Sequence, residues 1–568
     1  MKLAIAAFGI FSLYKIAATN LDVYIWLFAA SILVFALPAV VHEYYIRRRH
    51  FETTLQAVNT IEIETLDNKF SSYNSGEDYI NPDHVFSGDI DLFGKQGIYH
   101  LINRAATPLG CDMLADWMEN LLGADKAEVI INRQNAVREL ASKIDLRQDI
   151  QVYGKLISPR IHRGARISRM FEAPTHLLGR KWIVLVIYLL PVLLLTASGL
   201  MAAGLHWGFP LGLLLLHFMI NRRFSKQMEG IYKLSTRNAD ILRAYSRILK
   251  RIEEAEFSAS YLIDLQKDLH TDTGSSALQI RRLSRIVTLF DLRRSEILHP
   301  IFNSFFFWDL HCVLHIERWR ALNSRRISSW LKTIGEFEAL SSFACLYYNR
   351  PDWIFPEISY GNTILEAKAL GHPLIPREKR IANDFKISGK GRIAVITGPN
   401  MAGKSTFLKT LGVNIVLAQA GAPVCAEQCR LSPFRLLTSM KVSDSLNQEI
   451  SLFYAELLRL KMILEAMNSG NTIFFLLDEM LKGTNALDRQ AGALALLRQM
   501  TVKNTSGVVA THDLELTRLE KEFPEHIQNL HFDGYVEENN LRFDYKLKPG
   551  RCESFNALTL MRKIGIEV

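Results

Sequence analysis

The chain has few cysteines and no pattern that would use them. Its six cysteines show no spacing typical of a disulfide framework, and Cys425 and Cys429 have no partner histidines that would complete a metal site. Internal repeats and low-complexity tracts are also missing from the 568 residues. These absences argue against a disulfide-stabilised module, a zinc module or a repeat array, and they fit a reducing cytoplasmic setting.

Charge of either sign is missing from two long stretches, residues 23–41 and 182–205. Each is long enough to cross a hydrocarbon core of about 30 Å. Shorter uncharged stretches, 3–14 and 207–220, lie beside them, so each pair is interpreted as a helical hairpin. The alternatives are buried core helices for the long runs, an interfacial helix for the first short stretch, and a cleaved signal peptide at residues 1–19.

Basic residues flank these stretches and set the expected topology. They are Arg47, Arg48, Arg49, Arg180, Lys181, Arg222, Arg223 and Lys226. The sequence thus predicts a multi-pass protein of the inner (cytoplasmic) membrane, with a lipid bilayer as partner and its soluble parts in the cytoplasm. These eight cations also account for most of the net charge of +9, so basicity alone does not require nucleic acid.

A second basic stretch lies between residues 281 and 326 and is not explained by the membrane topology. It contains Arg281, Arg282, Arg285, Arg293, Arg294, Arg318, Arg320, Arg325 and Arg326. Such a stretch could grip phosphates, but a solvated helix face or a lipid-headgroup contact is the more common use of such charge.

A glycine-rich segment follows the apolar run 393–396 and precedes a helical pattern over residues 407–420. The segment is Gly398, Pro399, Asn400, Met401, Ala402, Gly403, Lys404, Ser405 and Thr406. In a loop of this pattern, backbone N–H groups surround a polyphosphate, the lysine reaches its outer phosphates and the serine hydroxyl ligates Mg²⁺. The segment therefore predicts a site for a nucleoside triphosphate with Mg²⁺.

Two further strand ends carry groups suited to phosphate hydrolysis. The apolar run 472–477 ends in Asp478 and Glu479, and the run 507–510 leads into His512. Since parallel strands present their carboxyl ends at one sheet edge, we expect these groups near the loop. Asp478 would hold the Mg²⁺ hydration shell, Glu479 would polarise the attacking water, and His512 would approach the γ-phosphate.

Together these segments resemble the ATPase domain of the MutS family. The resemblance is carried by TGPNMAGKST (397–406), VCAEQCRLSPFRLL (424–437), LLDEMLKGTNALD (476–488) and ATHDLELT (510–517), with the tail 545–566 also similar. It implies a C-terminal α/β P-loop ATPase of the ABC class, in which two subunits enclose ATP, so a homodimer is expected. Segments 97–118, 133–150 and 334–348 resemble, more faintly, the all-α MutS core and lever region that precedes it.

The resemblance also assigns roles to single residues. Ser451 matches a serine that touches the partner subunit's nucleotide, and Asp488 matches an acidic residue of the interface loop. From the residues alone, a helix cap for Ser451 and a surface charge for Asp488 are equally good interpretations. Where the family stacks an aromatic ring on adenine, this chain has Arg380, followed by Ile381; a guanidinium plane can also stack on a base, so base preference is open.

The expected organisation is a transmembrane hairpin (1–48), a linker (49–84), a core-like segment (85–178), a second hairpin (179–221), lever-like helices (222–350) and the ATPase domain (351–568). The Phe-x-Glu motif that MutS proteins use to read mismatches does not occur before Gly97. Two functions stay in contention, with an ABC exporter as a remote third. One is a membrane-anchored MutS-type ATPase coupled to double-stranded DNA; the other is an ATP-driven device acting on membrane or unknown protein partners.

Overall fold

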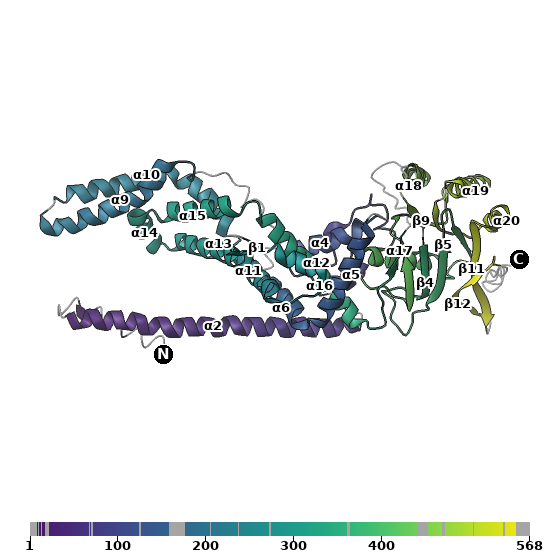
Figure 1. The fold of residues 1–568 in the computed structure, drawn as a ribbon, viewed down its shortest axis with the longest axis horizontal. Helices are drawn as coiled ribbons and strands as arrows, with labels where there is room; N and C mark the ends of the chain where they lie inside the picture. Colours follow the sequence, from purple (N-terminus) through teal and green to yellow (C-terminus); the bar gives the residue numbers. More distant parts are fainter. Residues whose placement is uncertain are drawn as a thin grey trace.

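The computed structural model is elongated, with a mixed α/β part at one end and a long helical part extending from it (Figure 1). It describes residues 22–552 except 68, 70–71, 124–125, 158–176, 205, 237, 272–273, 361–363, 441–451, 469–471, 504 and 538–539. Before residue 22 it describes residues 8, 11–12 and 14–16.

The part before residue 350 is almost entirely helical, as expected. Its elements are α2 (Asp22–Leu66), η1 (Glu77–Tyr79), α3 (Ile98–Ile102), α4 (Pro108–Glu119), α5 (Ala127–Ser142), α6 (Ile144–Lys155), α9 (Lys181–Leu200), η3 (Met201–Ala203), α10 (Gly208–Thr236), α11 (Ala239–Glu254), α12 (Ser260–Lys267), β1 (His270–Thr271), β2 (Gly274–Ser275), α13 (Ser276–Phe290), η4 (Asp291–Arg294), α14 (Leu298–Phe306), α15 (Trp308–Asn323) and α16 (Ile327–Asn349). The short antiparallel pair of β1 and β2 is the only sheet in the described portion of this region.

The multi-pass membrane location predicted from the apolar stretches is wrong. Of the described residues, a single helix, α9, combines the length and apolarity needed to cross a membrane, whereas that topology needs at least two. The apolar run 23–41 is the first half of the 45-residue helix α2, whose second half packs against α6. The uncharged part of α10 covers about 20 Å at 1.5 Å per residue, which is short of a bilayer core.

The C-terminal part consists of two sheets and their helices. Its elements are β3 (Glu357–Ile358), β4 (Ile364–Leu370), β5 (Asn383–Ser388), β6 (Ile393–Thr397), α17 (Lys404–Ala420), β7 (Gln428–Leu431), β8 (Arg435–Ser439), α18 (Leu452–Met467), β9 (Ile473–Asp478), α19 (Ala486–Val502), β10 (Ser506–Ala510), η5 (Leu514–Arg518), α20 (Leu519–Glu522), β11 (Ile527–Glu537) and β12 (Asn540–Pro549).

The larger sheet has the order β12-β11-β6-β10-β9-β8 and is parallel except for the edge strand β12. Strands β3, β7, β4 and β5 form a separate four-stranded sheet. The three predicted strands are present as β6, β9 and β10 and lie next to one another in the larger sheet. Their carboxyl ends therefore share one edge.

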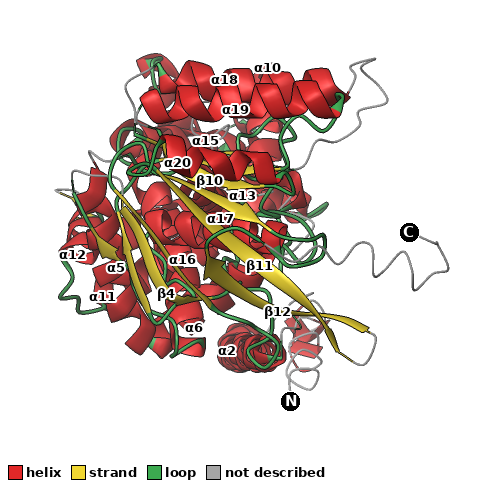
Figure 2. Ribbon diagram, turned by 90° about the vertical axis from the view of Figure 1, so that its right-hand side faces the viewer, coloured by secondary structure: helices red, strands yellow, loops and turns green. Residues whose placement is uncertain are grey.

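Both faces of the six-stranded sheet are buried, which explains the unbroken apolar strands. Along β6, Ala394 and Ile396 pack into the cluster that includes α17, whereas Ile393 and Val395 pack into the cluster that includes α18 and α19. Figure 2 shows α18 and α19 together on one side of the strands. The sheet therefore holds β6 rigidly between two cores.

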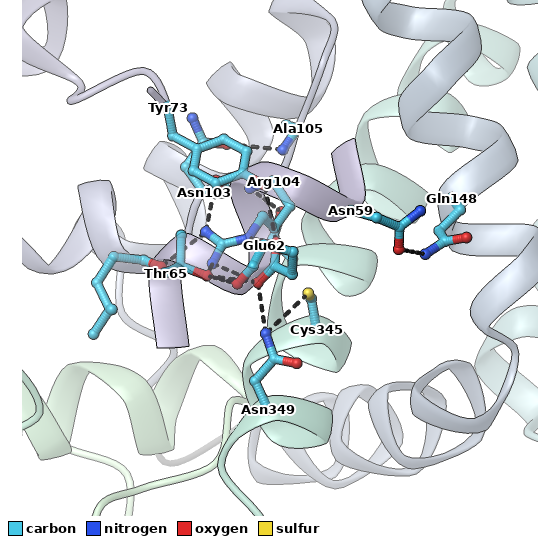
Figure 3. Close-up of polar contacts among 12 residues, drawn as sticks. Asn59, Glu62, Thr65, Tyr73, Asn103, Arg104, Ala105, Gln148, Cys345 and Asn349 are labelled. Atoms are coloured by element: carbon cyan, nitrogen blue, oxygen red, sulfur yellow. Dashed lines mark hydrogen bonds and ion pairs between the residues drawn. The ribbon is translucent and has the colours of Figure 1, made fainter. Parts of the chain in front are cut away.

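One buried ion pair fastens α2 to the helical core (Figure 3). The carboxylate of Glu62 accepts two hydrogen bonds from the Arg104 guanidinium, at 2.7 and 2.9 Å. Tyr73 and Thr65 donate to the same carboxylate at 2.9 and 3.0 Å, and Asn349 of α16 also donates to it. The C-terminal end of α2 is thus tied to the segment that follows α3 and to α16.

A second set of contacts joins the residues before α3 to the α/β part. Asp91 forms an ion pair of 2.6 Å with Lys409 of α17, and Asp89 accepts a 2.5 Å hydrogen bond from Thr438 of β8. Gly412 lets α17 approach this segment, because a Cβ there would lie 2.7 Å from Ile90. The helical part is therefore in direct contact with the helix that follows the glycine-rich segment.

Candidate functional site

The segment between β6 and α17 has the backbone of an anion-binding loop. Gly398, Met401 and Gly403 have φ values of 147°, 70° and 103°, and Gly403 is the N-cap of α17. These conformations turn the chain sharply at the sheet edge, and the free N–H groups at the start of α17 favour a negatively charged ligand. The buried strand β6 on one side and α17 on the other hold the loop in place.

Lys404 begins α17 and points its ammonium back over the loop. Its Nζ donates to the carbonyl oxygens of Gly398 and Pro399 at 2.8 and 3.0 Å. Burial lowers the pKa of the Lys404 ammonium, and the nearby carboxylates of Glu479 and Asp478 partly oppose this effect. A buried cation between the loop and two carboxylates is suited to hold the outer phosphates of a nucleotide.

Asp478 and Ser405 offer the oxygen ligands expected for Mg²⁺. Burial raises the pKa of Asp478, while a hydrogen bond with Ser405 lowers it. Its Oδ1 is buried and has no hydrogen-bond partner among the described residues. Mg²⁺ is typically held by one or two protein oxygens together with phosphates and water. The pair of groups therefore fits the metal.

Glu479 stands one residue beyond β9 with φ of 51°. Its carboxylate lies 3.3 Å from Lys482 Nζ and 3.6 Å from His512 Nδ1. Burial raises the pKa of Glu479, but Lys482 and His512 outweigh this and lower it. At neutral pH the group is thus a carboxylate, directed by two basic side chains toward the edge where β6, β9 and β10 end.

Glu456 of α18 supports this turn, a role that was not predicted from the sequence. Its carboxylate accepts hydrogen bonds from the backbone N–H of Leu481 and, at 3.0 Å, of Lys482. Leu481 also has a positive φ of 59°, so two of three consecutive residues adopt a sparsely populated conformation. The sequence offered one indication of such a role, because Glu456 lies in the same SLFYAEL segment as Ser451.

A cavity of about 470 Å³ opens between the loop and the edge of β5 and β12. Of the predicted residues, those lining it are Ile381, Asn400, Met401, Gly403, Lys404, Ser405, Thr406 and Glu479. Arg380 does not line it; its guanidinium is directed to Cys425 Sγ at 2.7 Å and the Ile375 carbonyl at 3.1 Å.

Tyr545 lines the same cavity and was missed in the sequence analysis. It lies on β12 with φ of 53°, and its carbonyl accepts a hydrogen bond of 3.0 Å from Asn383. Its ring is close to the loop, since a Cβ on Gly403 would lie 3.2 Å from it. The available signal was an aromatic residue at the start of the tail 545–566. This ring, together with Ile381, offers the surface for a base that was expected of Arg380.

Asp488, which was expected to act on a second subunit, does not line this cavity. Asp488 is exposed in the first turn of α19, where its N–H and carboxylate are hydrogen-bonded to Asn485 at 2.9 and 2.6 Å. Its neighbour Leu487 is 79% exposed. Ser451 lies outside the described residues, as does most of the tail 545–566.

Comparison with known proteins agrees with this arrangement. The family described as MutS domain V matches residues 394–567. The DNA mismatch repair protein MutS of Thermotoga maritima is 34% identical over 240 residues, covering 41% of this chain and 28% of that protein. The corresponding protein of Persephonella marina is 30% identical over 251 residues, covering 44% and 28%. That of Lactococcus lactis subsp. cremoris is 28% identical over 247 residues, covering 42% and 29%.

The chain thus spans less than a third of the length of these relatives. The relatives carry the name of a DNA repair protein, and only α9 of the described helices could cross a membrane. Both findings argue against the multi-pass location, and neither supports the lipid bilayer or the unknown protein as partners.

Proposed function

Because this chain belongs to the MutS family through its domain V, we propose that it is a Mg²⁺-dependent ATPase whose hydrolysis is coupled to DNA binding. One observation carries the proposal. The loop 398–405, Asp478, Glu479 and His512 come from three separate strand ends and lie at one sheet edge, beside a cavity of about 470 Å³. The ATPase unit comprises residues 351–568. Its conformational change on ATP binding and hydrolysis is transmitted to the core-like segment 85–178 and the lever-like helices 222–350.

Each residue has a defined part in the proposed reaction. The N–H groups of the loop and the Lys404 ammonium bind the β- and γ-phosphates, and Tyr545 and Ile381 enclose the base. Ser405 and Asp478 hold Mg²⁺, which neutralises phosphate charge when it is bound. Glu479 orients the water for in-line attack, and Lys482 and His512 keep its carboxylate ionised.

The proposed active unit is a homodimer. The exposed Asp488 and Leu487 at the start of α19 are free to meet a second copy. We assign Ser451 to the contact with the other subunit's γ-phosphate, so that ATP closes the two copies and hydrolysis releases them. A DNA duplex held by the helical parts would then be gripped and released in step with ATP turnover.

Replacement of the catalytic carboxylate tests the proposal. Glu479→Gln should bind Mg²⁺-ATP, hydrolyse it at least about a hundredfold more slowly, and accumulate as a closed dimer. Turnover is measured by phosphate release and the dimer by light scattering. The matched control, Glu515→Gln, changes a partly exposed carboxylate that pairs with Arg518 and does not line the cavity, and it should behave as wild type. Normal turnover in Glu479→Gln would refute the assignment of the base.

The coupling to DNA has its own test. Double-stranded DNA should bind at low salt and raise the rate of ATP hydrolysis by the full chain. Absence of both binding and stimulation at about 50 mM salt, where phosphate contacts are strongest, would remove DNA from the proposal and leave the ATPase.

A further inference from the structure

A basic cleft of about 730 Å³ lies in the helical part, far along the chain from the ATPase residues. It is formed by α2, α6, α11 and α13. Six arginines and one lysine are among the described residues that line it, against one carboxylate, Glu254. It therefore concentrates positive charge between helices that the proposed ATP site does not use.

The cations converge because of helical spacing. On α11, Arg243, Arg247 and Arg251 recur every four residues, opposite the buried face of that helix. On α13, Arg281 and Arg285 recur in the same way. The two helices pack side by side, so the stripes form one surface, and α2 runs alongside (Figure 1). Only two of the nine arginines between 281 and 326, Arg281 and Arg285, thus line the cleft. The other arginines of the cleft come from α2 and α11, which are distant in sequence.

Some of these cations are neutralised locally and others are not. Four ion pairs occur: Arg47–Glu43 at 2.7 Å, Arg243–Asp240 at 3.5 Å, Lys250–Glu254 at 3.3 Å and Arg251–Asp149 at 2.6 Å. Within the described part of the chain, no carboxylate pairs with Arg247, Arg281 or Arg285. Three guanidinium groups therefore face the same cleft without a counter-charge.

Arg247 is the most enclosed of the three. It is half-buried, and its guanidinium lies 5.5 Å from the centre of the Tyr153 ring. Burial lowers its pKa, and the neighbouring cations Arg47, Arg243 and Arg281 lower it further. Like charges held this close repel one another, and a bound anion would relieve that repulsion.

We propose that this cleft binds the phosphodiester backbone of a nucleic acid, with Arg247, Arg281 and Arg285 contacting its phosphates. Guanidinium groups match phosphate geometry with two parallel N–H donors. Because the cations are spread along two helices, they fit a linear polyanion better than one free phosphate. The proposal rests on the DNA part of the proposed function and assigns it a contact surface.

The test removes the three unpaired charges together. The variant Arg247→Gln, Arg281→Gln, Arg285→Gln is compared with wild type by fluorescence anisotropy of labelled duplex and single-stranded DNA at several salt concentrations. Affinity at about 0.1 M salt should fall about a hundredfold, and the slope of log affinity against log salt should become shallower by about 2 to 3. ATP turnover without DNA should be unchanged, which shows that the variant is folded.

Two further variants keep the test decisive. Arg282→Gln changes an exposed arginine next to Arg281 that does not line the cleft, and it should bind DNA as wild type does. Arg281→Gln with Arg285→Gln changes only exposed side chains, so it should fold even if the triple variant does not. Its affinity should fall at least about tenfold.

The outcomes separate this proposal from the proposed function. If wild type binds DNA and the cleft variants bind equally well with the same salt slope, the cleft is not the contact surface. An equal loss of DNA affinity in Arg282→Gln would also overturn the proposal, since the loss would then reflect the lower net charge of the protein and not the cleft. If wild type binds no DNA at low salt, the DNA part of the proposed function fails as well. If inorganic triphosphate binds the cleft and polynucleotides do not, the ligand is a small anion and the proposal is wrong.

Discussion

Replacing Glu62 with glutamine should loosen α2 from the helical core and lower stability by about 3 to 5 kcal/mol, the usual cost of breaking a buried ion pair. The Arg104 side chain is 8% exposed and that of Glu62 is 20% exposed, and their two hydrogen bonds are 2.7 and 2.9 Å long. The substitution keeps the shape of Glu62 but leaves the Arg104 charge buried without its partner.

The pKa of Glu62 gives an independent estimate of this magnitude. Burial raises it, but Arg104 and the hydroxyl donors outweigh burial and lower it from 4.5 to about 2. Each unit corresponds to about 1.4 kcal/mol, so the ionised carboxylate contributes about 3 kcal/mol. Because the folded pKa is the lower one, this contribution is present above about pH 4.5 and is lost as the pH falls toward about 2.

Thermal unfolding and hydrogen exchange over the end of α2 measure the effect. Glu64→Gln, an exposed neighbour on the same helix, is the matched control and should change stability by less than about 0.5 kcal/mol. The deficit of Glu62→Gln should shrink in acid, since wild type then loses the same contribution. If Glu62→Gln and Glu64→Gln exchange and unfold alike at pH 7, the ion pair does not fasten α2.

Two other changes have defined outcomes. Burial raises the pKa of Glu338 to about 7, so the stability of the wild-type protein should decline by about 3 kcal/mol as the pH rises from about 4.5 to 7. Glu338→Gln can still accept a hydrogen bond from the Thr107 N–H but does not ionise, so it should remove this decline. Denaturant titrations at several pH values measure the difference. Gly398→Ala should weaken ATP binding more than about tenfold in a fluorescent-nucleotide titration, because φ is 147° and its Cβ would lie 2.6 Å from the Phe532 carbonyl oxygen. The control is Gly179→Ala, because a Cβ at Gly179 would meet no atom within 4 Å. If Gly398→Ala binds ATP with wild-type affinity, the loop tolerates a side chain at this position and the predicted strain is wrong.

Local pattern was enough to predict the elements around the loop. The apolar runs before Gly398, Asp478 and His512 are short and end in polar residues, which is typical of buried parallel strands. The structure confirms these strands as β6, β9 and β10, next to one another in one sheet. The helical character of the region before residue 350 was predicted in the same way. Such features depend on spacing along the chain, which the sequence states completely.

The apolar stretches misled because length and hydropathy do not reveal where a helix ends. The run 23–41 looked like a separate span, but α2 continues to Leu66, where the Glu62 ion pair to Arg104 holds it. Arg104 lies 42 residues from Glu62 in sequence, so the pattern of residues near Glu62 does not predict this pairing.

The sequence by itself determined the glycine-rich segment between β6 and α17 and the two carboxylates at the end of β9, since these features lie in residues close along the chain. Only the tertiary structure decided that Tyr545 rather than Arg380 faces the cavity, that Glu456 supports the turn after Glu479, and that Arg247 meets Arg281 in one cleft. The physical reason is that side-chain direction and long-range packing depend on how distant segments meet, and spacing along the chain does not contain that information.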